Sequence, residues 1–321
     1  MSFATVIIPT YNRPEHLAAV LDALTVQAEA TLPFSVVVVD DGSAPPVRLG
    51  NHGWPFGVRL VRFETNRGRA AARNAGLGIV GTPLAIFLDD DMRPLRGFVR
   101  AHVEAVDPGK AMIGLGSVTF HPDIPRDRLT TYLETRGVAK LGPADSVPFK
   151  YFLTYNSAAP TELLRRVGGF DERLRAWGGE DLELGWRLHR AGARFIRVPR
   201  AQAYHAHRRS LDDLIAVSVG FGEKSLPLIL EKHPQLVSEL RVHLFGPVRY
   251  RNGTPPDRIA LRAVTRAPFP DLVRRMASAW PRLPWPTAVF DYLIVSAWRC
   301  GLDRTGFAHS AGAVDSGDPS L

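Results

Sequence analysis

Three consecutive aspartates, Asp89, Asp90 and Asp91, follow an apolar run in the stretch AIFLDDDMRP. Adjacent carboxylates repel one another and resist burial, so a fold keeps them where a cation, a proton or a helix terminus offsets their charge. The apolar run before them is typical of a buried β-strand. A cap for a following helix could use one aspartate but hardly three. We therefore expect these side chains at a strand end that faces a cleft.

Two further groups of residues have side chains suited to chemistry. Glu180 and Asp181 open the stretch EDLELGWRLHRAG, whose spacing predicts a helix that stops at Gly192. Carboxylates are favourable in any first helical turn, and for an isolated acidic pair that structural interpretation would be the better one. His205 and His207 follow in YHAHRRS. Imidazole is the commonest metal ligand, although a histidine on a loop is more often incidental.

Arginines gather in the stretch NRGRAAARNAGL, which places Arg67, Arg69 and Arg73 around Asn66 and Gly68. The pattern predicts a helix that begins at or just after these residues. Guanidinium groups and exposed helix N–H donors suit a diphosphate. The alternative is a solvated helix face, and for Arg67 and Arg69 the two interpretations are equally supported.

The elements that must position these residues alternate along the first third of the chain. ATVIIPTY, FSVVVVDDGS and LAIFLDDD have the composition of buried strands, and NRPEHLAAVLDALTVQ has helical spacing with Pro14 in its first turn. Strands that end in polar residues and alternate with helices predict a parallel sheet with a ligand at its carboxyl edge. Thr10, Asp41 and Asp91 would then lie along one rim.

The length of 321 residues, 45% of them hydrophobic, allows one large domain or two smaller ones. We expect an α/β domain over residues 1–207, a helical extension over 208–306 and a disordered tail over 307–321. The N-terminus has no basic region ahead of an apolar segment, so we expect no signal peptide and a cytoplasmic location. The single cysteine, Cys300, excludes a disulfide framework and a cysteine-cluster metal site, which leaves oxygen and imidazole ligands.

The net charge of +8 permits contact with phosphate-bearing substrates, nucleic acid or an anionic membrane, and does not choose among them. Residues 258–299 combine seven arginines with tryptophans and the stretch AVFDYLIVSAW, a composition that suits a helix in a membrane interface. That stretch is too short to span a bilayer. In the alternative interpretation the aromatics pack the C-terminal helices and the arginines are solvated. We expect no nucleic-acid partner.

Five stretches, taken in order, resemble the inverting family 2 glycosyltransferases with the GT-A fold: VIIPTYNRPEHL, VVVVDDGS, NRGRAAARNAGL, FLDDD and GGFDERLRAWGGEDLELGWRLHRAG. The last is similar to the corresponding stretch of chondroitin polymerase and of polypeptide N-acetylgalactosaminyltransferases. The resemblance covers about residues 3–207. It implies a Rossmann-like mixed α/β sheet flanked by helices, and metal-dependent transfer of a sugar, with inversion, from a nucleotide diphosphate sugar to an acceptor hydroxyl. UDP is the expected nucleotide.

The resemblance also implies roles for individual residues. Asp181 would be the general base, and Glu180 would orient the donor or acceptor sugar. Asp91 and His205 would ligate Mn²⁺ or Mg²⁺, with the choice between Asp90 and Asp91 open by one position. The donor nucleotide sugar is assigned to Pro9, Thr10, Tyr11, Asn12, Arg13, Asp41, Asn66, Arg73, Asp89 and Asp90. Taken on its residues alone, DDGS is equally well a turn with an Asx hydrogen bond.

Functions from other classes remain as alternatives. A nucleotidyltransferase also binds a nucleotide on an α/β domain with metal-bound aspartates, but the sequence has no GxxxxGK loop for the phosphates. A catalytically silent sugar-nucleotide-binding protein would lose Asp181 or the metal ligands, which are retained here. A dinucleotide oxidoreductase is disfavoured because no G-x-G-x-x-G follows the first strand. The acceptor is open among a lipid-linked intermediate, a polysaccharide, a small natural product and a protein side chain.

Overall fold

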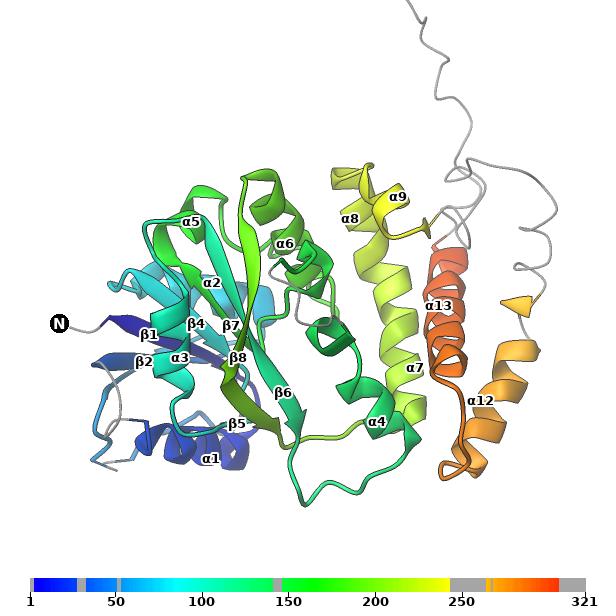
Figure 1. Ribbon diagram of the computed structural model, residues 1–321, viewed down its shortest axis with the longest axis horizontal. Helices are drawn as coiled ribbons and strands as arrows, with labels where there is room; N and C mark the ends of the chain where they lie inside the picture. The colour runs from blue at the N-terminus through cyan, green and yellow to red at the C-terminus, as the bar shows by residue number, and fades with distance from the viewer. Residues whose placement is uncertain are drawn as a thin grey trace, which may run out of the picture. The chain divides into compact units, whose positions relative to one another are not determined.

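The computed structural model describes residues 3–27, 33–50, 53–140, 146–242, 264–266 and 268–305 (Figure 1). The tail expected over 307–321 lies outside the described residues. The chain divides into two compact units: the first comprises Met1–Arg175 and Glu180–Arg208, and the second comprises Ala176–Gly179 and Arg209–Leu321. The candidate catalytic side chains all lie in the first unit.

The first unit is built on a mixed sheet, with the strand order β3-β2-β1-β4-β7-β6-β8-β5 among the described residues. β1 pairs in parallel with β2 and β4, whereas β7 runs antiparallel to β4 and β6, and β5 antiparallel to β8. The mixed α/β sheet expected from the sequence is confirmed. The strands are β1 Ala4–Thr10, β2 Phe34–Asp40, β3 Gly57–Arg62, β4 Leu84–Leu88, β5 Met92–Pro94, β6 Met112–Phe120, β7 Asn156–Pro160 and β8 Arg194–His205.

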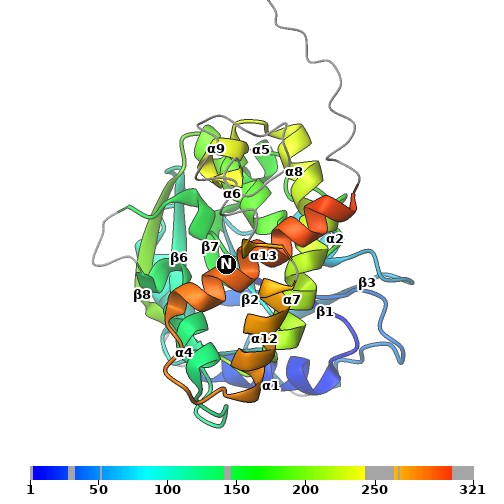
Figure 2. The same ribbon diagram turned by 90° about the vertical axis from the view of Figure 1, so that its right-hand side faces the viewer.

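Helices flank this sheet, and the regular elements described in the second unit are also helical (Figures 1 and 2). Those of the first unit are α1 Pro14–Thr25, α2 Arg69–Ile79, α3 Phe98–Ala105, α4 Arg128–Glu134, α5 Thr161–Arg166 and α6 Glu180–Arg190, with short 3₁₀ turns at Gly137–Lys140 and Phe149–Tyr151. Those of the second unit are α7 Leu211–Gly220, a π-helical turn at Phe221–Ser225, α8 Leu226–Lys232, α9 Leu236–Glu239, α12 Phe269–Ala279 and α13 Thr287–Arg304. Among the described helices, none combines the length and the apolar character needed to cross a membrane.

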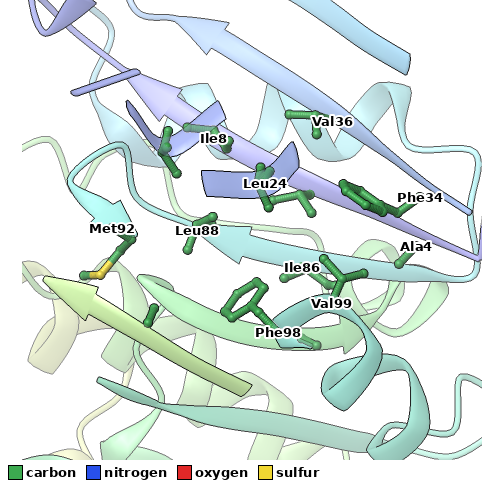
Figure 3. Close-up of a cluster of buried hydrophobic side chains, with 14 of the residues drawn as sticks. Ala4, Ile8, Leu24, Phe34, Val36, Ile86, Leu88, Met92, Phe98 and Val99 are labelled. Atoms are coloured by element: carbon green, nitrogen blue, oxygen red, sulfur yellow. The ribbon is translucent and has the colours of Figure 1, made fainter. Parts of the chain in front are cut away.

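Both faces of β1, β2 and β4 are buried, which explains why their sequences are almost continuously apolar. On one face, Ile8, Val36 and Ile86 pack with side chains of α1 and α3, such as Leu24 and Phe98 (Figure 3). Since successive strand residues point to opposite faces, the next residues along β2 face the other way. Val37 and Val39 pack there against Ala72 of α2.

Helix α2 lies close to the sheet because it has a glycine at the contact. A Cβ atom on Gly76 would come within 2.5 Å of Ile7 Cγ2, whereas a Cβ atom on Gly78 would meet nothing within 4 Å. Ile7 is fully buried and β-branched, so its side chain has little freedom to move aside. The close packing sets the distance of α2 from β1 and therefore the position of every side chain that α2 carries.

We expect Gly76→Ala to destabilise the protein by about 1–3 kcal/mol, because the added methyl group overpacks a rigid contact between α2 and β1. Gly78→Ala is the matched control in the same helix. It adds the same methyl group in open space, and should be neutral or stabilising by up to about 1 kcal/mol through helix propensity. Urea denaturation followed by circular dichroism measures both midpoints. Equal midpoints for the two variants would refute the close contact.

Candidate active site

The carboxyl ends of the parallel strands bring the sequence-predicted polar residues to one edge of the sheet. Thr10 ends β1, and its hydroxyl donates a hydrogen bond to Asp90 Oδ2 just beyond β4, at 2.8 Å. The backbone N–H of Asp41, just beyond β2, donates to the carbonyl of Thr10 at 2.9 Å. The rim expected from the sequence is therefore present, because the register of β1 with β2 and β4 aligns the three strand ends.

The three consecutive aspartates are held by two arginines and a hydroxyl. Asp89 Oδ1 accepts from Arg73 Nη2 at 2.8 Å, and Asp90 Oδ2 accepts from the Thr10 hydroxyl. Arg13 Nη1 donates to Asp91 Oδ2 at 2.9 Å and to Asp90 Oδ1 at 3.4 Å. Burial raises the pKa of Asp90 to about 7, and the charges of its two neighbours add to this effect while the Thr10 hydroxyl and the charge of Arg13 oppose it. The sequence places these carboxylates together, and the fold relieves their repulsion with these donors.

Asp91 lies beside His205 because the two flank a strand pair. Met92 of β5 is opposite His205 of β8, and the N–H of Ala206 donates to the Asp91 carbonyl at 2.8 Å. The side chains approach to 3.5 Å between His205 Nε2 and Asp91 Oδ2. Burial works to raise the pKa of Asp91, but the hydrogen bond and charge of His205, followed by the charge of Arg13, hold it well below its usual range.

A hard divalent cation fits the Asp91–His205 pair. Asp91 Oδ1 is buried and accepts no hydrogen bond, so one carboxylate oxygen is available as a ligand next to an imidazole nitrogen. In the part of the chain that the structure describes, no group of three or more His, Cys, Asp or Glu side chains is arranged to hold a metal ion. A cation at this pair would therefore take its other ligands from water and from substrate oxygens, as Mg²⁺ and Mn²⁺ commonly do.

Arg73 connects the strand end to helix α6. Its side chain is 2% exposed, and its two terminal nitrogens reach Asp89 Oδ1 at 2.8 Å, Glu180 Oε1 at 3.1 Å and Asp181 Oδ1 at 3.7 Å. Burial works to lower the pKa of Arg73, but the charges of Asp89, Asp181 and Glu180 outweigh it and raise the pKa. Since buried carboxylates require a compensating cation, Arg73 allows all three to occupy this region.

Asp181 is a candidate general base with a raised pKa. It is held by Thr154, whose hydroxyl donates to Oδ1 at 2.7 Å and whose backbone N–H donates to Oδ2 at 3.2 Å. Burial raises the pKa of Asp181 to about 6, the charge of Glu180 adds to the rise, and Arg73 and Thr154 oppose it. The carboxylate is therefore largely ionised at neutral pH and still basic enough to accept a proton.

Sequence reasoning missed Thr154. The residue lies in FLTYNSAAP, which carries no recognisable motif. Its position follows from the pairing of β7 with β4, in which Asn156 is opposite Leu88. If the antiparallel register continues past the end of β4, Thr154 lies opposite the aspartates that follow Leu88. A polar residue just before a buried antiparallel strand is the only local signal, and it does not say which carboxylate the residue will meet.

The other predicted donor residues lie around the loops that follow β1 and β2. Asn12 has a left-handed backbone with φ 53°, and its side chain accepts from the N–H of Ala44 at 2.9 Å. Tyr11 is 44% exposed, and Pro9 lies within β1. Arg13 joins this loop to Asp91, as described above. The structure thus brings residues 9–13 close to the aspartates.

Asp41 holds the loop that leads into α2. Its carboxylate accepts from the N–H of Arg67 at 2.7 Å and from that of Gly68 at 2.9 Å, and Gly68 is the N-cap of α2, with φ 92°. Burial raises the pKa of Asp41, while these two hydrogen bonds oppose the rise. Asn66 is exposed in the same loop. Each oxygen of Asp41 has a second lone pair, which could accept a further hydrogen bond. The contact of Asp41 with a nucleotide base stays a prediction.

Glu180, Arg67 and Arg69 form ion pairs within the protein. Glu180 is 1% exposed, and Arg69 Nε approaches its Oε1 at 3.5 Å in addition to Arg73. Arg67 forms a surface ion pair with Glu172 at 3.1 Å and stacks over the ring of Phe63. Of the three arginines, Arg73 is therefore the one that is buried among the candidate catalytic groups.

Comparison with protein families finds two matches that together cover residues 5–209. The model described as glycosyl transferase family 2 matches residues 5–163, and the model described as the N-terminal domain of galactosyltransferase matches residues 146–209. All the residues assigned above lie within these two ranges. The second match contains Thr154, Glu180, Asp181 and His205.

Curated relatives and solved structures agree with this family. The pre-mycofactocin glycosyltransferase of Mycobacterium tuberculosis is 32% identical over 243 residues, which are 74% of this chain and 49% of the relative. The validoxylamine A glucosyltransferase of Streptomyces hygroscopicus is 30% identical over 273 residues, 74% of this chain and 62% of the relative. The chain thus spans about half to three fifths of the length of these two relatives.

Among solved structures, the mannosyltransferase PcManGT from Pyrobaculum calidifontis, in complex with GDP-Man and Mn²⁺, superimposes with a TM-score of 0.58 at 24% identity. The superposition covers 94% of this chain and 88% of that one, and at this identity it shows a shared fold. The order of the motifs, the mixed sheet and the matched ranges agree. The chain belongs to glycosyl transferase family 2.

Proposed function

We propose that this protein transfers a sugar from a nucleotide diphosphate sugar to an acceptor hydroxyl, with inversion at the anomeric carbon and with a divalent cation. The observation that carries the proposal is Asp181, whose pKa is raised to about 6 and whose carboxylate lies 3.7 Å from the guanidinium that also binds Asp89. One residue, Arg73, thus connects a candidate base with the candidate donor site at the strand ends.

In this reaction the acceptor oxygen attacks the anomeric carbon from the face opposite the nucleotide. The bond between that carbon and the phosphate oxygen breaks, and its electron pair leaves with the nucleoside diphosphate. Asp181 takes the proton of the acceptor hydroxyl as the new bond forms. One base suffices for inversion, and Thr154 and Arg73 keep its carboxylate ionised and in a fixed orientation.

The cation would bind at Asp91 and His205, whose buried free oxygen and imidazole nitrogen suit it. A bound Mn²⁺ or Mg²⁺ would neutralise charge on the departing diphosphate. Asp90 contributes differently, since one of its oxygens accepts from Thr10 and the other contacts Arg13. Asp91 is therefore the metal ligand in this proposal.

The donor would occupy the rim formed by residues 9–13, Asp41 and Asp89, with UDP as its nucleotide. Asp41 retains lone pairs for a uracil N–H, and Asp89, whose side chain is 28% exposed, can reach a ribose hydroxyl while it is paired with Arg73. Asn66 and Arg73 complete the proposed donor set. GDP is the principal competitor, since PcManGT was solved with GDP-Man.

A panel of nucleotide sugars with Mn²⁺ and saccharide, lipid-linked and small-molecule acceptors tests the proposal. We expect release of nucleoside diphosphate that depends on the acceptor, and a product whose anomeric configuration is opposite to that of the donor by proton NMR. Release of pyrophosphate would instead indicate a nucleotidyltransferase. Binding without turnover across the panel would indicate a sugar-nucleotide-binding protein.

The first prediction for this site is that binding of UDP requires a divalent cation and that Asp91→Ala abolishes this requirement, because the cation bridges Asp91 to the diphosphate. Isothermal titration calorimetry with Mn²⁺ and with chelator measures it. The matched control is Asp22→Ala, an exposed aspartate of α1, which should keep the wild-type response within about twofold. Equal affinity of the wild type with and without the cation would argue against a metal at Asp91.

The second prediction concerns the base. Asp181→Asn keeps the shape of the side chain and removes its basicity, so we expect turnover to fall by about 10²–10⁴ while donor affinity stays within a few fold. Steady-state kinetics and calorimetry separate the two effects. Unchanged turnover would assign the base elsewhere. A joint collapse of turnover and affinity would indicate that Asp181 acts chiefly by holding the start of α6.

The third prediction follows from the pKa of Asp181. Since the carboxylate is the active form, kcat/KM should decline as the pH falls through about 6. Thr154→Val removes a hydroxyl that stabilises this carboxylate, so the decline should move to higher pH by about one unit. Thr154→Ser retains the hydroxyl and should restore the wild-type profile. A Thr154→Val profile that matches the wild type would show that Thr154 does not tune the base.

A further inference from the structure

Helix α12 of the second unit carries an apolar stripe on its exposed side. Phe269, Leu272, Met276 and Trp280 are 54%, 57%, 39% and 53% exposed, and Leu283 follows at 47%. Their spacing of three and four residues places the first four on one face of the helix. Single exposed apolar residues are normal on a protein surface, whereas a contiguous set of large ones marks a surface that binds something. These five residues form the α12 stripe.

The other sides of α12 either pack against neighbouring helices or carry polar residues. Ala277 is buried at the side that contacts α13 and α7, and Arg274 is ion-paired with Asp212 of α7. Asp271 and Ser278 lie seven residues apart on the solvent-facing side, away from the stripe. The α12 stripe is therefore not the face by which the helix packs within its own unit.

The charges around the α12 stripe are positive. Between residues 264 and 286 the sequence has four arginines, at 266, 274, 275 and 282, and one acid, Asp271. Arg266, Arg275 and Arg282 are exposed in the structure. Trp280 is the C-cap of α12, and Trp285 donates its indole N–H to the Trp280 carbonyl at 2.9 Å. Tryptophan and arginine beside an apolar helix face are typical of a segment at a membrane interface.

We propose that the α12 stripe docks this protein on the surface of an anionic lipid bilayer, with the helix lying in the interface plane. The apolar side chains enter the boundary between headgroups and acyl chains, and the flanking arginines contact the acidic headgroups. This binding is reversible and is weakened by salt, because part of the attraction is electrostatic. It does not depend on the transfer reaction proposed above.

Charge favours a bilayer over a second copy of this chain as the occupant. Two stripes facing each other across a twofold axis would bring their exposed arginines together, and like charges at an interface core oppose association. An anionic bilayer instead neutralises these arginines while it covers the same apolar side chains. Residues 258–299 are expected from the sequence to lie at a membrane. Within this range, residues 258–263 and 267 lie outside the described residues, and the proposal does not use them.

Co-sedimentation of the full chain with vesicles tests the proposal. We expect binding to vesicles that contain phosphatidylglycerol, weaker binding to pure phosphatidylcholine vesicles, and loss of the difference at high salt. The double variant Leu272→Gln, Met276→Gln should lower the partition coefficient at least about tenfold without a change in charge. Ser278→Gln, on the polar side of the same helix, is the matched control and should bind as the wild type does.

A second measurement does not depend on the folding of a stripe variant. Brominated lipids should quench part of the tryptophan fluorescence of the wild type, and Trp280→Phe should remove most of that quenching. No sedimentation with anionic vesicles at low salt, or equal binding by the double variant, overturns the proposal. A wild-type dimer that the double variant converts to a monomer, without vesicle binding, assigns the stripe to a second copy and overturns it too.

Discussion

The burial of Arg73 is the constraint on which the candidate site depends. A guanidinium that is 2% exposed must be matched by carboxylates, and it is matched by Asp89 at the end of β4 and by Glu180 at the start of α6. Removing one partner of such a buried set leaves an uncompensated charge, which typically costs about 3–5 kcal/mol. Helix α2, which carries Arg73, is fixed in turn by its close contact with β1 and by Asp41 at its first residues. The sheet thus sets the position of the Arg73 guanidinium, and this positive charge stabilises the carboxylates of Asp89 and Glu180 close together.

The same balance of charge gives Asp181 its chemical character. Burial and the neighbouring Glu180 disfavour the ionised form, whereas Arg73 and the Thr154 hydroxyl favour it. The opposing effects leave the pKa near 6, in the range where a carboxylate is both ionised and useful as a base at neutral pH. An exposed aspartate at the same helix terminus would be ionised but a weaker base. The buried network therefore turns a common helix-start residue into a candidate catalytic one.

The candidate site is formed partly by parallel strands and partly by antiparallel ones. The parallel strands β1, β2 and β4 bring Thr10, Asp41 and the aspartates to one edge, as in other open α/β sheets. β7 then delivers Thr154 through its pairing with β4, and β8 delivers His205 through its pairing with β5. The galactosyltransferase-type match over residues 146–209 coincides with this second half of the site. The second unit adds a different property, an exposed apolar stripe among arginines.

The sequence by itself determined an α/β sheet with the acids grouped at its strand ends, and its resemblance to the family 2 glycosyltransferases added the family and the mixed sheet. The strands, the helices and the grouping of the acids follow from local patterns, since apolar runs, helical spacing and the residues after each strand can be recognised within short windows. The sequence also predicted the helix that begins at Glu180. In the structure this helix ends at Arg190, and Gly192 follows it with a left-handed backbone, φ 81°. Only the tertiary structure decided which carboxylate meets which partner. Asp90 and Asp91 are equivalent in the sequence, yet one is buried on Thr10 and the other lies beside His205. Thr154 was not predicted at all, because its contact with Asp181 depends on strand register between distant segments, which no local pattern encodes.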